Sequence, residues 1–183
     1  APGMAAMTTA MLAPLKAGDH VVAAKALFGS CRYVIETLLP RYGITSTLVD
    51  GRDLDAWRKA MRPNTKTLFL ESPTNPTLEV VAIAAARANS PPGRARFVGV
   101  NWFRGPPLAA KHNDGQGRCL GGIILSSEQF IMEHIHNFFR QTGPSMSPFN
   151  AWVLLKGLET LGVRVKAQTE SAAKIADVLA AHP

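Results

Sequence analysis

The stretch Thr65-Lys66-Thr67-Leu68-Phe69-Leu70-Glu71-Ser72-Pro73-Thr74-Asn75-Pro76 decides the fold. Residues 65–70 are mostly apolar and show no clear polar alternation, which is typical of a short strand covered on both faces. The residues that follow are rich in Pro, Ser and Thr and predict a loop. A buried strand that runs into a polar loop is typical of a parallel sheet, where ligands bind at the carboxyl ends of the strands.

Other short apolar stretches repeat this pattern and alternate with segments of helical composition. The predicted strands cover residues 20–24, 44–49, 65–70, 97–100 and 121–125. The predicted helices cover residues 3–15, 30–39, 54–61, 81–88, 128–140 and 148–181, with N-caps at Ser30 and Asp53 and a break at Gly162. This alternation predicts an α/β fold with a mostly parallel sheet flanked by helices. The loops that hold Phe28 and Asn75, and the loop after Val100, would then meet at one edge of the sheet.

The composition bounds the class of protein. The chain has 183 residues, of which 46% are hydrophobic and 18% are charged, as in globular domains. No run of about 18 apolar residues and no signal-peptide pattern is visible, so we expect no membrane partner and a cytoplasmic location. The two cysteines, Cys31 and Cys119, stand far apart and in no metal-ligand spacing, which indicates reduced thiols and no metal site. The first residue is Ala1 rather than Met, as it would be in a fragment.

The net charge of +7 comes mostly from one region. Residues 87–118 hold six Lys or Arg residues against the single acid Asp114, so this region supplies five of the seven charges. Its basic residues neither line a predicted helix face nor alternate with stacking aromatic residues, so we expect no nucleic-acid partner. Four prolines also fall in this region, at positions 91, 92, 106 and 107, and indicate an irregular loop around one short strand.

A second loop, Lys111-His112-Asn113-Asp114-Gly115-Gln116-Gly117-Arg118, carries the candidate for chemistry. Its glycines suit a close approach of the backbone to a bound molecule. A desolvated lysine has a lowered pKa and can attack a carbonyl as a neutral amine, which is what an aldehyde cofactor held as a Schiff base requires. A solvated surface charge is the alternative interpretation of Lys111.

Several segments, taken in order, resemble the Cys/Met metabolism family of pyridoxal-phosphate enzymes. The matching segments are Gly-Met-Ala-Ala at 3–6, Ala-Gly-Asp-His-Val-Val at 17–22, Leu-Phe-Gly-Ser at 27–30, Glu-Ser-Pro-Thr-Asn-Pro-Thr-Leu-Glu at 71–79, Lys-His-x-Asp-Gly-Gln-Gly-Arg at 111–118, and 143–161. The resemblance implies the large cofactor-binding domain of fold-type I pyridoxal-phosphate enzymes, with pyridoxal 5'-phosphate as cofactor. Residues 1–161 would be a partial cofactor-binding domain, and residues 162–183 a helix leading towards a C-terminal domain that the chain lacks.

The same resemblance implies roles for five residues. Gly3 and Met4 would offer backbone N–H groups to the cofactor phosphate, since a helix start that carries a glycine suits an anion. Phe28 would stack on the pyridine ring, where many relatives carry Tyr. Asn75 would hydrogen-bond the phenolic oxygen of the cofactor. Lys111 would form the Schiff base and carry protons between substrate carbons.

Within the family, the chain most resembles the sulfhydrylases that make homocysteine from O-succinylhomoserine and sulfide in methionine biosynthesis. The substrates would be an O-acyl homoserine and sulfide, and the family packs as homo-oligomers such as homotetramers. Three alternatives stay open. They are a cystathionine γ-synthase or γ-lyase of the same family, a non-catalytic fragment that binds family partners, and a nucleic-acid binder supported by the charge alone.

The chain also departs from the family pattern. Val100 stands where the family has the aspartate that keeps the pyridine nitrogen protonated. Leu108 and Ala110 replace the Ser and Thr that would hydrogen-bond the phosphate, and the span from Val100 to Lys111 is shorter by roughly a dozen residues, about one strand with its connection. We therefore expect a disturbed segment over residues 87–110, from a reading-frame disturbance, a sequencing error or a decayed gene, and impaired activity.

Overall fold

The computed structural model describes residues 3–74, 77–81, 96–100 and 115–182. Its centre is a four-stranded sheet in the order β2-β1-β3-β4, in which every neighbouring pair is parallel. The strands are β1 (His20–Ala24), β2 (Thr45–Val49), β3 (Thr65–Glu71) and β4 (Arg96–Val100). The prediction of an α/β fold with a parallel sheet is confirmed, and four of the five predicted strands are present to within one residue at each end.

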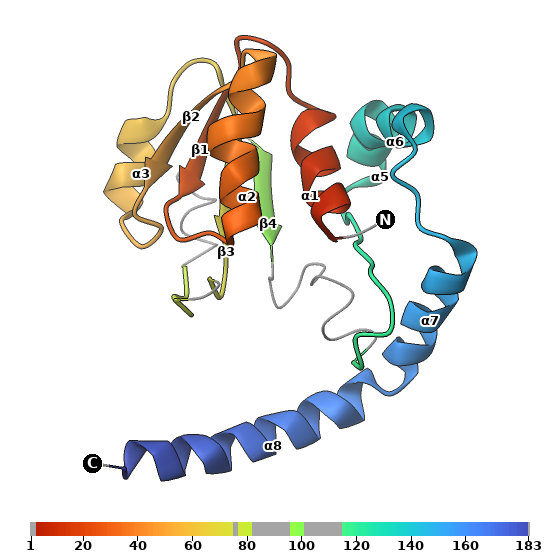
Figure 1. The fold of residues 1–183 in the computed structure, drawn as a ribbon. Coiled ribbons are helices and arrows are strands. Elements are labelled where there is room, and N and C mark those ends of the chain that lie inside the picture. Colours follow the sequence, from red (N-terminus) through yellow and green to blue (C-terminus); the bar gives the residue numbers. More distant parts are fainter. Residues whose placement is uncertain (1–2, 75–76, 82–95, 101–114, 183) are drawn as a thin grey trace.

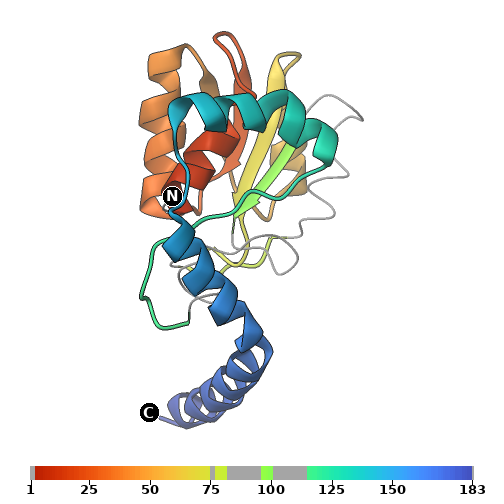
Figure 2. The ribbon, with the colours of Figure 1, turned by 90° about the vertical axis from the view of Figure 1, so that its right-hand side faces the viewer.

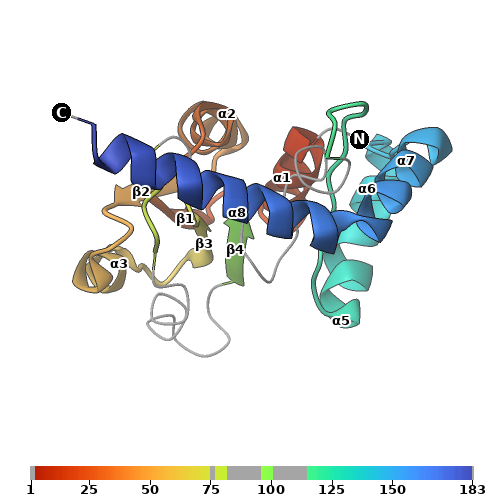
Figure 3. The same cartoon turned by 90° about the horizontal axis from the view of Figure 1, so that it is seen from below.

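Helices cover both faces of this sheet. One face carries α1 (Gly3–Leu12) and α2 (Gly29–Tyr33), and the other carries α3 (Leu54–Ala60), as the view along the strands shows (Figure 3). The α2 helix continues without a gap through the π-helical η1 (Val34–Leu38) and the 3-10 turn η2 (Leu39–Tyr42). Each connection between parallel strands must return from one end of the sheet to the other. The helices in these connections therefore lie on the faces of the sheet and bury it.

The hydrophobic core lies between the sheet and these helices. All five residues of β1 are buried, which explains why this strand shows no alternation of polar and apolar residues. From the α1 and α2 side, Met11 and Ile35 are fully buried against the sheet, and from α3 Trp57 is 1% exposed. A strand buried on both faces is the central element of the fold, as its apolar run predicts.

The rest of the described chain is helical. It contains α5 (Glu128–Phe130), η3 (Ile131–Ile135), α6 (His136–Thr142), α7 (Pro148–Glu159) and α8 (Leu161–Ala180). The first three lie beside α1, whereas α7 and α8 extend away from the sheet, and no residue of α8 is buried (Figures 1 and 2). Within the described part of the chain, no helix combines the length and apolar character needed to cross a bilayer.

The predicted strand at residues 121–125 is wrong. These residues have no strand or helix assignment, and Ile123 and Leu125 are 48% and 61% exposed. A strand is stable only where a neighbouring edge supplies hydrogen bonds, and among the described residues only β1 to β4 belong to the sheet. An apolar run with β-branched residues is therefore compatible with a strand, but residues 121–125 do not pair with the sheet in this structure.

Helix boundaries differ in three places. The N-cap of α2 is Phe28 rather than Ser30, because the backbone is already extended at Phe28 (φ −54°, ψ 135°) and turns helical at Gly29. Pro40 does not end this helix, since a proline is tolerated in the first turn of η2. The break in the C-terminal tract is at Thr160, which leaves the helical conformation, and not at Gly162. Apart from Val81, the predicted helix at 81–88 lies outside the described residues.

Candidate functional site

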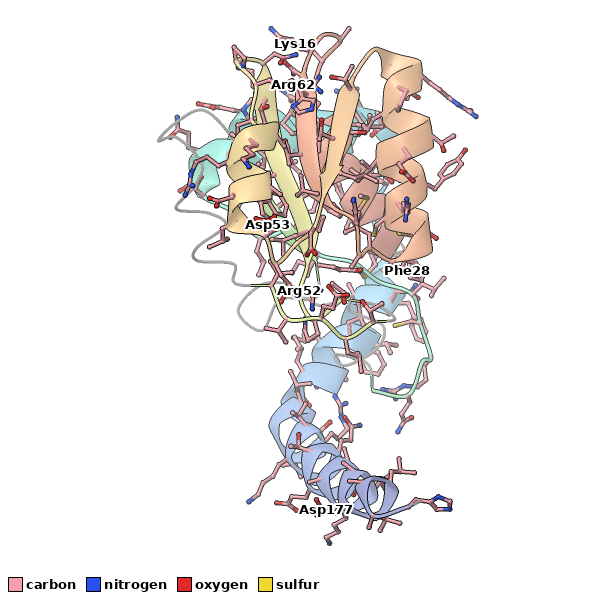
Figure 4. The ribbon with its side chains drawn as sticks, turned by 90° about the vertical axis from the view of Figure 1, so that its left-hand side faces the viewer. Lys16, Phe28, Arg52, Asp53, Arg62 and Asp177 are labelled. Carbon is pink, nitrogen blue, oxygen red and sulfur yellow. The ribbon has the colours of Figure 1, made fainter. Side chains whose placement is uncertain are left out.

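The carboxyl ends of the strands form the edge at which sequence analysis predicts a site. The arrowheads of β1 and β4 point towards the end of the body from which α7 and α8 extend, and α1 and α2 begin at this same end (Figure 1). Phe28, Arg52 and Asp53 lie towards this end, whereas Lys16 and Arg62 lie at the opposite end (Figure 4). The loops after β1 and β2 and the starts of two helices therefore converge on one edge.

Gly3 and Met4 are the first two residues of α1 and are partly buried. The first N–H groups of a helix have no intrahelical partner, and the aligned peptide dipoles make this end positive. Because α1 packs against α2, the helix start lies on the same side of the sheet as Phe28. This placement suits the binding of an anionic group, which is the role predicted for the two residues.

Phe28 lies in the short loop from β1 to α2, and this loop is held at both ends. The Lys25 N–H donates to the Val49 carbonyl at the end of β2 (2.8 Å), and the Phe28 N–H donates to Oε2 of Glu71 at the end of β3 (2.6 Å). The Phe28 side chain is 37% exposed. A fixed backbone with a partly open ring is the arrangement that a stacking residue needs.

Glu71 is a residue of this edge to which sequence analysis gave no role. It is the last residue of β3 and is completely buried, although it carries a carboxyl group. Burial of a carboxylate is unfavourable unless hydrogen bonds compensate, and the bond from Phe28 is one of them. The available signal was an acidic residue directly after an apolar strand, at the edge where ligands bind.

Cys31 is the third residue of α2 and is 2% exposed. Burial, together with the negative charge of Glu71, raises the pKa of the Cys31 thiol to about 12. The thiol is therefore protonated at neutral pH, and a protonated buried thiol is a poor nucleophile.

We expect iodoacetamide at pH 8 to leave Cys31 unmodified in the folded chain and to alkylate it rapidly in 6 M guanidinium chloride. Peptide mapping by mass spectrometry measures the alkylated fraction. Glu71→Gln should leave the protection largely intact, because burial is the larger cause of the raised pKa. Fast alkylation of Cys31 in the native chain would contradict its burial beside Glu71.

The segment after β3 contains Asn75 in its sequence. Asn75 itself lies outside the described residues, but the residues on both sides are tied together. The Val81 N–H donates to the Ser72 hydroxyl (3.1 Å), and the Glu79 N–H donates to the Thr74 hydroxyl (2.8 Å). These side chain–backbone bonds close a compact loop at the carboxyl edge.

Lys111, Leu108 and Ala110 also lie outside the described residues, so the structure does not place the predicted Schiff-base lysine. Val100 is placed by its backbone: it ends β4 and pairs in register with Glu71 at the end of β3. The position at which the resemblance predicts an acid is thus at the carboxyl edge. In the described ranges, no three His, Cys, Asp or Glu side chains gather as metal ligands would.

The parallel sheet, covered by helices on both faces and with helix starts and loops at its carboxyl edge, has the large-domain fold of fold-type I pyridoxal-phosphate enzymes, as the match to solved structures shows. A solved structure of cystathionine gamma-lyase from Lactobacillus plantarum, complexed with L-serine, superposes with a TM-score of 0.93 at 30% identity, covering 100% of this chain and 51% of the other. The family model described as "Cys/Met metabolism PLP-dependent enzyme" matches residues 1–91 and 108–183. The chain belongs to this pyridoxal-phosphate-dependent family.

Two curated relatives carry the same name. An O-succinylhomoserine sulfhydrylase of Mycobacterium tuberculosis (strain ATCC 25618 / H37Rv) is 45% identical over 197 residues, covering 100% of this chain and 48% of the relative. One of Pseudomonas aeruginosa is 38% identical over 198 residues, covering 100% of this chain and 49% of the relative. The chain thus spans about half the length of the curated relatives that it matches.

The match to the family is interrupted at one place. The family model leaves out residues 92–107, which fall inside the tract 87–110 that the sequence marks as disturbed. The alignment with the Mycobacterium relative extends over 197 positions, 14 more than the 183 residues of this chain. The disturbance of this tract stays a prediction. The division of the chain into a cofactor-binding part at 1–161 and a helix at 162–183 also stays a prediction.

Proposed function

We propose that this chain is the cofactor-binding part of an enzyme that makes homocysteine from O-succinylhomoserine and sulfide. The observation that carries the proposal is the convergence of the α1 start, the Phe28 loop and the end of β4 at one sheet edge. The relatives named O-succinylhomoserine sulfhydrylase support the choice of substrate. A cytoplasmic location and a homo-oligomeric state, such as a homotetramer, fit this metabolic role.

When bound, pyridoxal 5'-phosphate supplies an electron sink for negative charge that develops on the substrate carbon. The N–H groups of Gly3 and Met4 would bind its phosphate, and the Phe28 ring would cover one face of its pyridine ring. Asn75 would donate to its phenolic oxygen. Lys111 would hold the cofactor and move a proton between substrate carbons through its amine.

Two features of the chain support impaired activity. Val100 has no charge with which to keep the pyridine nitrogen protonated, so the electron sink would be weaker. Leu108 and Ala110 offer no hydroxyl groups to the phosphate. Both changes would leave the transition state less stabilised.

An assay of the chain with added pyridoxal phosphate tests these points. Sulfide and cysteine are offered in turn as the thiol, and homocysteine and cystathionine are measured. We expect a low rate that favours sulfide, and Val100→Asp should raise this rate at least about 10-fold, which corresponds to about 1.4 kcal/mol of transition-state stabilisation. A high rate of homocysteine formation by the unaltered chain would contradict impaired activity. A preference for cysteine as the thiol would contradict the sulfhydrylase assignment.

A cystathionine γ-lyase or γ-synthase is the second candidate, because the matched Lactobacillus structure is a cystathionine gamma-lyase at 30% identity. A non-catalytic oligomer partner is the third. Mixing the chain with an intact relative, followed by size-exclusion chromatography, tests it. A mixed oligomer without turnover would favour the partner role over catalysis.

A further inference from the structure

The buried carboxylate at the end of β3 joins two segments that are 43 residues apart in sequence. Oε2 of Glu71 accepts the Phe28 N–H at 2.6 Å, and the Glu71 side chain is completely buried. A hydrogen bond to a carboxylate is shorter and stronger than one between neutral groups. This bond therefore fixes the backbone of Phe28 more firmly than an ordinary turn would.

The Phe28 loop is also held by Leu27, which is buried in the core, and by the Phe28 carbonyl, which accepts the Arg32 N–H (3.0 Å). As the N-cap residue of α2, Phe28 makes no side-chain capping bond, and its ring is partly open to solvent. The loop is tied to β2 through Lys25 and to β3 through Glu71. Of these two bonds, the bond to Glu71 is made by Phe28 itself, whose ring would contact the cofactor.

The burial of Glu71 has an energetic consequence. An apolar residue at the same place would avoid the desolvation of a carboxylate, and replacing buried ionic groups by apolar ones is often neutral or stabilising. A buried acid at a ligand-binding edge is thus weak evidence for a role in stability alone. Its hydrogen bond to the Phe28 N–H, at the start of α2, points to the placement of the Phe28 loop as a role for this carboxylate.

We propose that Glu71 is a positioning residue, which acts through Phe28 to set the aromatic ring against the cofactor. The inference rests on the proposed function, in which Phe28 stacks on the pyridine ring. What it requires is an oxygen acceptor at the Oε2 position, and the negative charge only adds strength to the bond. Glutamine at this position should therefore largely serve, whereas a residue of similar size without an oxygen should not.

The test compares Glu71→Gln with Glu71→Met, and uses Glu79→Gln as the control. Glu79 is a glutamate of the same edge whose carboxylate lies 3.6 Å from Arg52 and which the proposal does not involve. The first readout, amide exchange of Phe28 by NMR, requires no cofactor. The second is the Kd for pyridoxal phosphate, measured also in Phe28→Leu and in the double variant Phe28→Leu/Glu71→Met.

We expect Glu71→Met to speed Phe28 amide exchange at least about tenfold and to raise the Kd about tenfold, as expected for loss of one charge-assisted hydrogen bond. Glu71→Gln and Glu79→Gln should stay within about threefold of the unaltered chain. The double variant should bind no more weakly than Phe28→Leu alone, since Glu71 acts through that ring. A purely structural role would instead make the two losses multiply.

Three results would overturn the proposal: an unchanged Kd in Glu71→Met, multiplied losses in the double variant, or a loss in Glu71→Gln equal to that in Glu71→Met. If Glu71→Met fails to fold, Glu71→Asp replaces it, because its shorter carboxylate withdraws the acceptor while the charge stays. If the unaltered chain binds no pyridoxal phosphate, the proposed function is wrong, and Glu71 then has no role in positioning the Phe28 ring against the cofactor. The exchange rates then still show whether Glu71 anchors Phe28, so the two failures are distinguishable.

Discussion

Trp57→Ala is expected to lower the free energy of unfolding by about 3–5 kcal/mol, a large part of the 5–15 kcal/mol typical of a domain. Trp57 is 1% exposed on the α3 face of the sheet, so its removal leaves a cavity. Its indole N–H also donates to the Gly51 carbonyl (3.1 Å), and this bond fixes the loop after β2 at the carboxyl edge. Urea denaturation followed by circular dichroism measures the loss.

Trp57→Phe is the matched control, because it keeps an aromatic ring and removes the N–H donor. We expect it to lose about half as much, since the Gly51 carbonyl would lack one partner and the ring would fill less of the site. Gly51 itself has little room: a Cβ there would lie 3.0 Å from Val81 Cγ2 and 3.3 Å from the Ala24 Cβ. A loss below about 1 kcal/mol in Trp57→Ala would contradict the packing of α3 on the sheet.

Acidification is expected to cost the fold about 3 kcal/mol through His20 alone, between pH 7 and pH 4. His20 opens β1 at the amino end of the sheet and is fully buried. Its ring nitrogens lie 2.8 Å from the Thr65 hydroxyl on β3 and 2.9 Å from the Thr47 hydroxyl on β2. Burial, and next the charge of Arg62, lower the pKa of His20 from 6.5 to about 4.

The sign follows from the proton balance. Because the folded pKa lies below the unfolded one, the unfolded chain takes up the proton first as the pH falls. The stability linked to His20 is complete above pH 6.5 and is lost as the pH falls towards 4. Carboxylates also titrate in this range, so the control is His20→Gln, whose curve of unfolding free energy against pH should be flatter by about 3 kcal/mol. Parallel curves for the two proteins would show that His20 does not carry this effect.

Local signals predicted much of the fold. Residues 20–24 were predicted as a strand and form β1 with the same ends, because a buried strand needs an unbroken apolar run. Asp53 was predicted to cap a helix, and its carboxylate accepts the N–H groups of Asp55 (2.9 Å) and Ala56 (3.0 Å). In both cases the signal lies within a few consecutive residues, although β1 itself pairs with the distant strands β2 and β3.

Signals that depend on distant partners were missed. Residues 121–125 have strand composition but no strand assignment, because pairing depends on an available edge and not on composition. The bond between Glu71 and Phe28 spans 43 residues, so no local pattern could reveal it. For the candidate site, Gly3, Met4 and Phe28 lie at the carboxyl edge, where their roles stay predictions, whereas Asn75 and Lys111 lie outside the described residues.

The central claim is that Lys111 is the lysine that holds the cofactor. The chain is loaded with pyridoxal phosphate and reduced with borohydride, and the labelled lysine is located by peptide mass spectrometry. We predict that the label is concentrated on the peptide containing Lys111 and disappears in Lys111→Ala. Labelling spread over Lys16, Lys25 and the other lysines to the same extent, or a label unchanged in Lys111→Ala, would contradict the account.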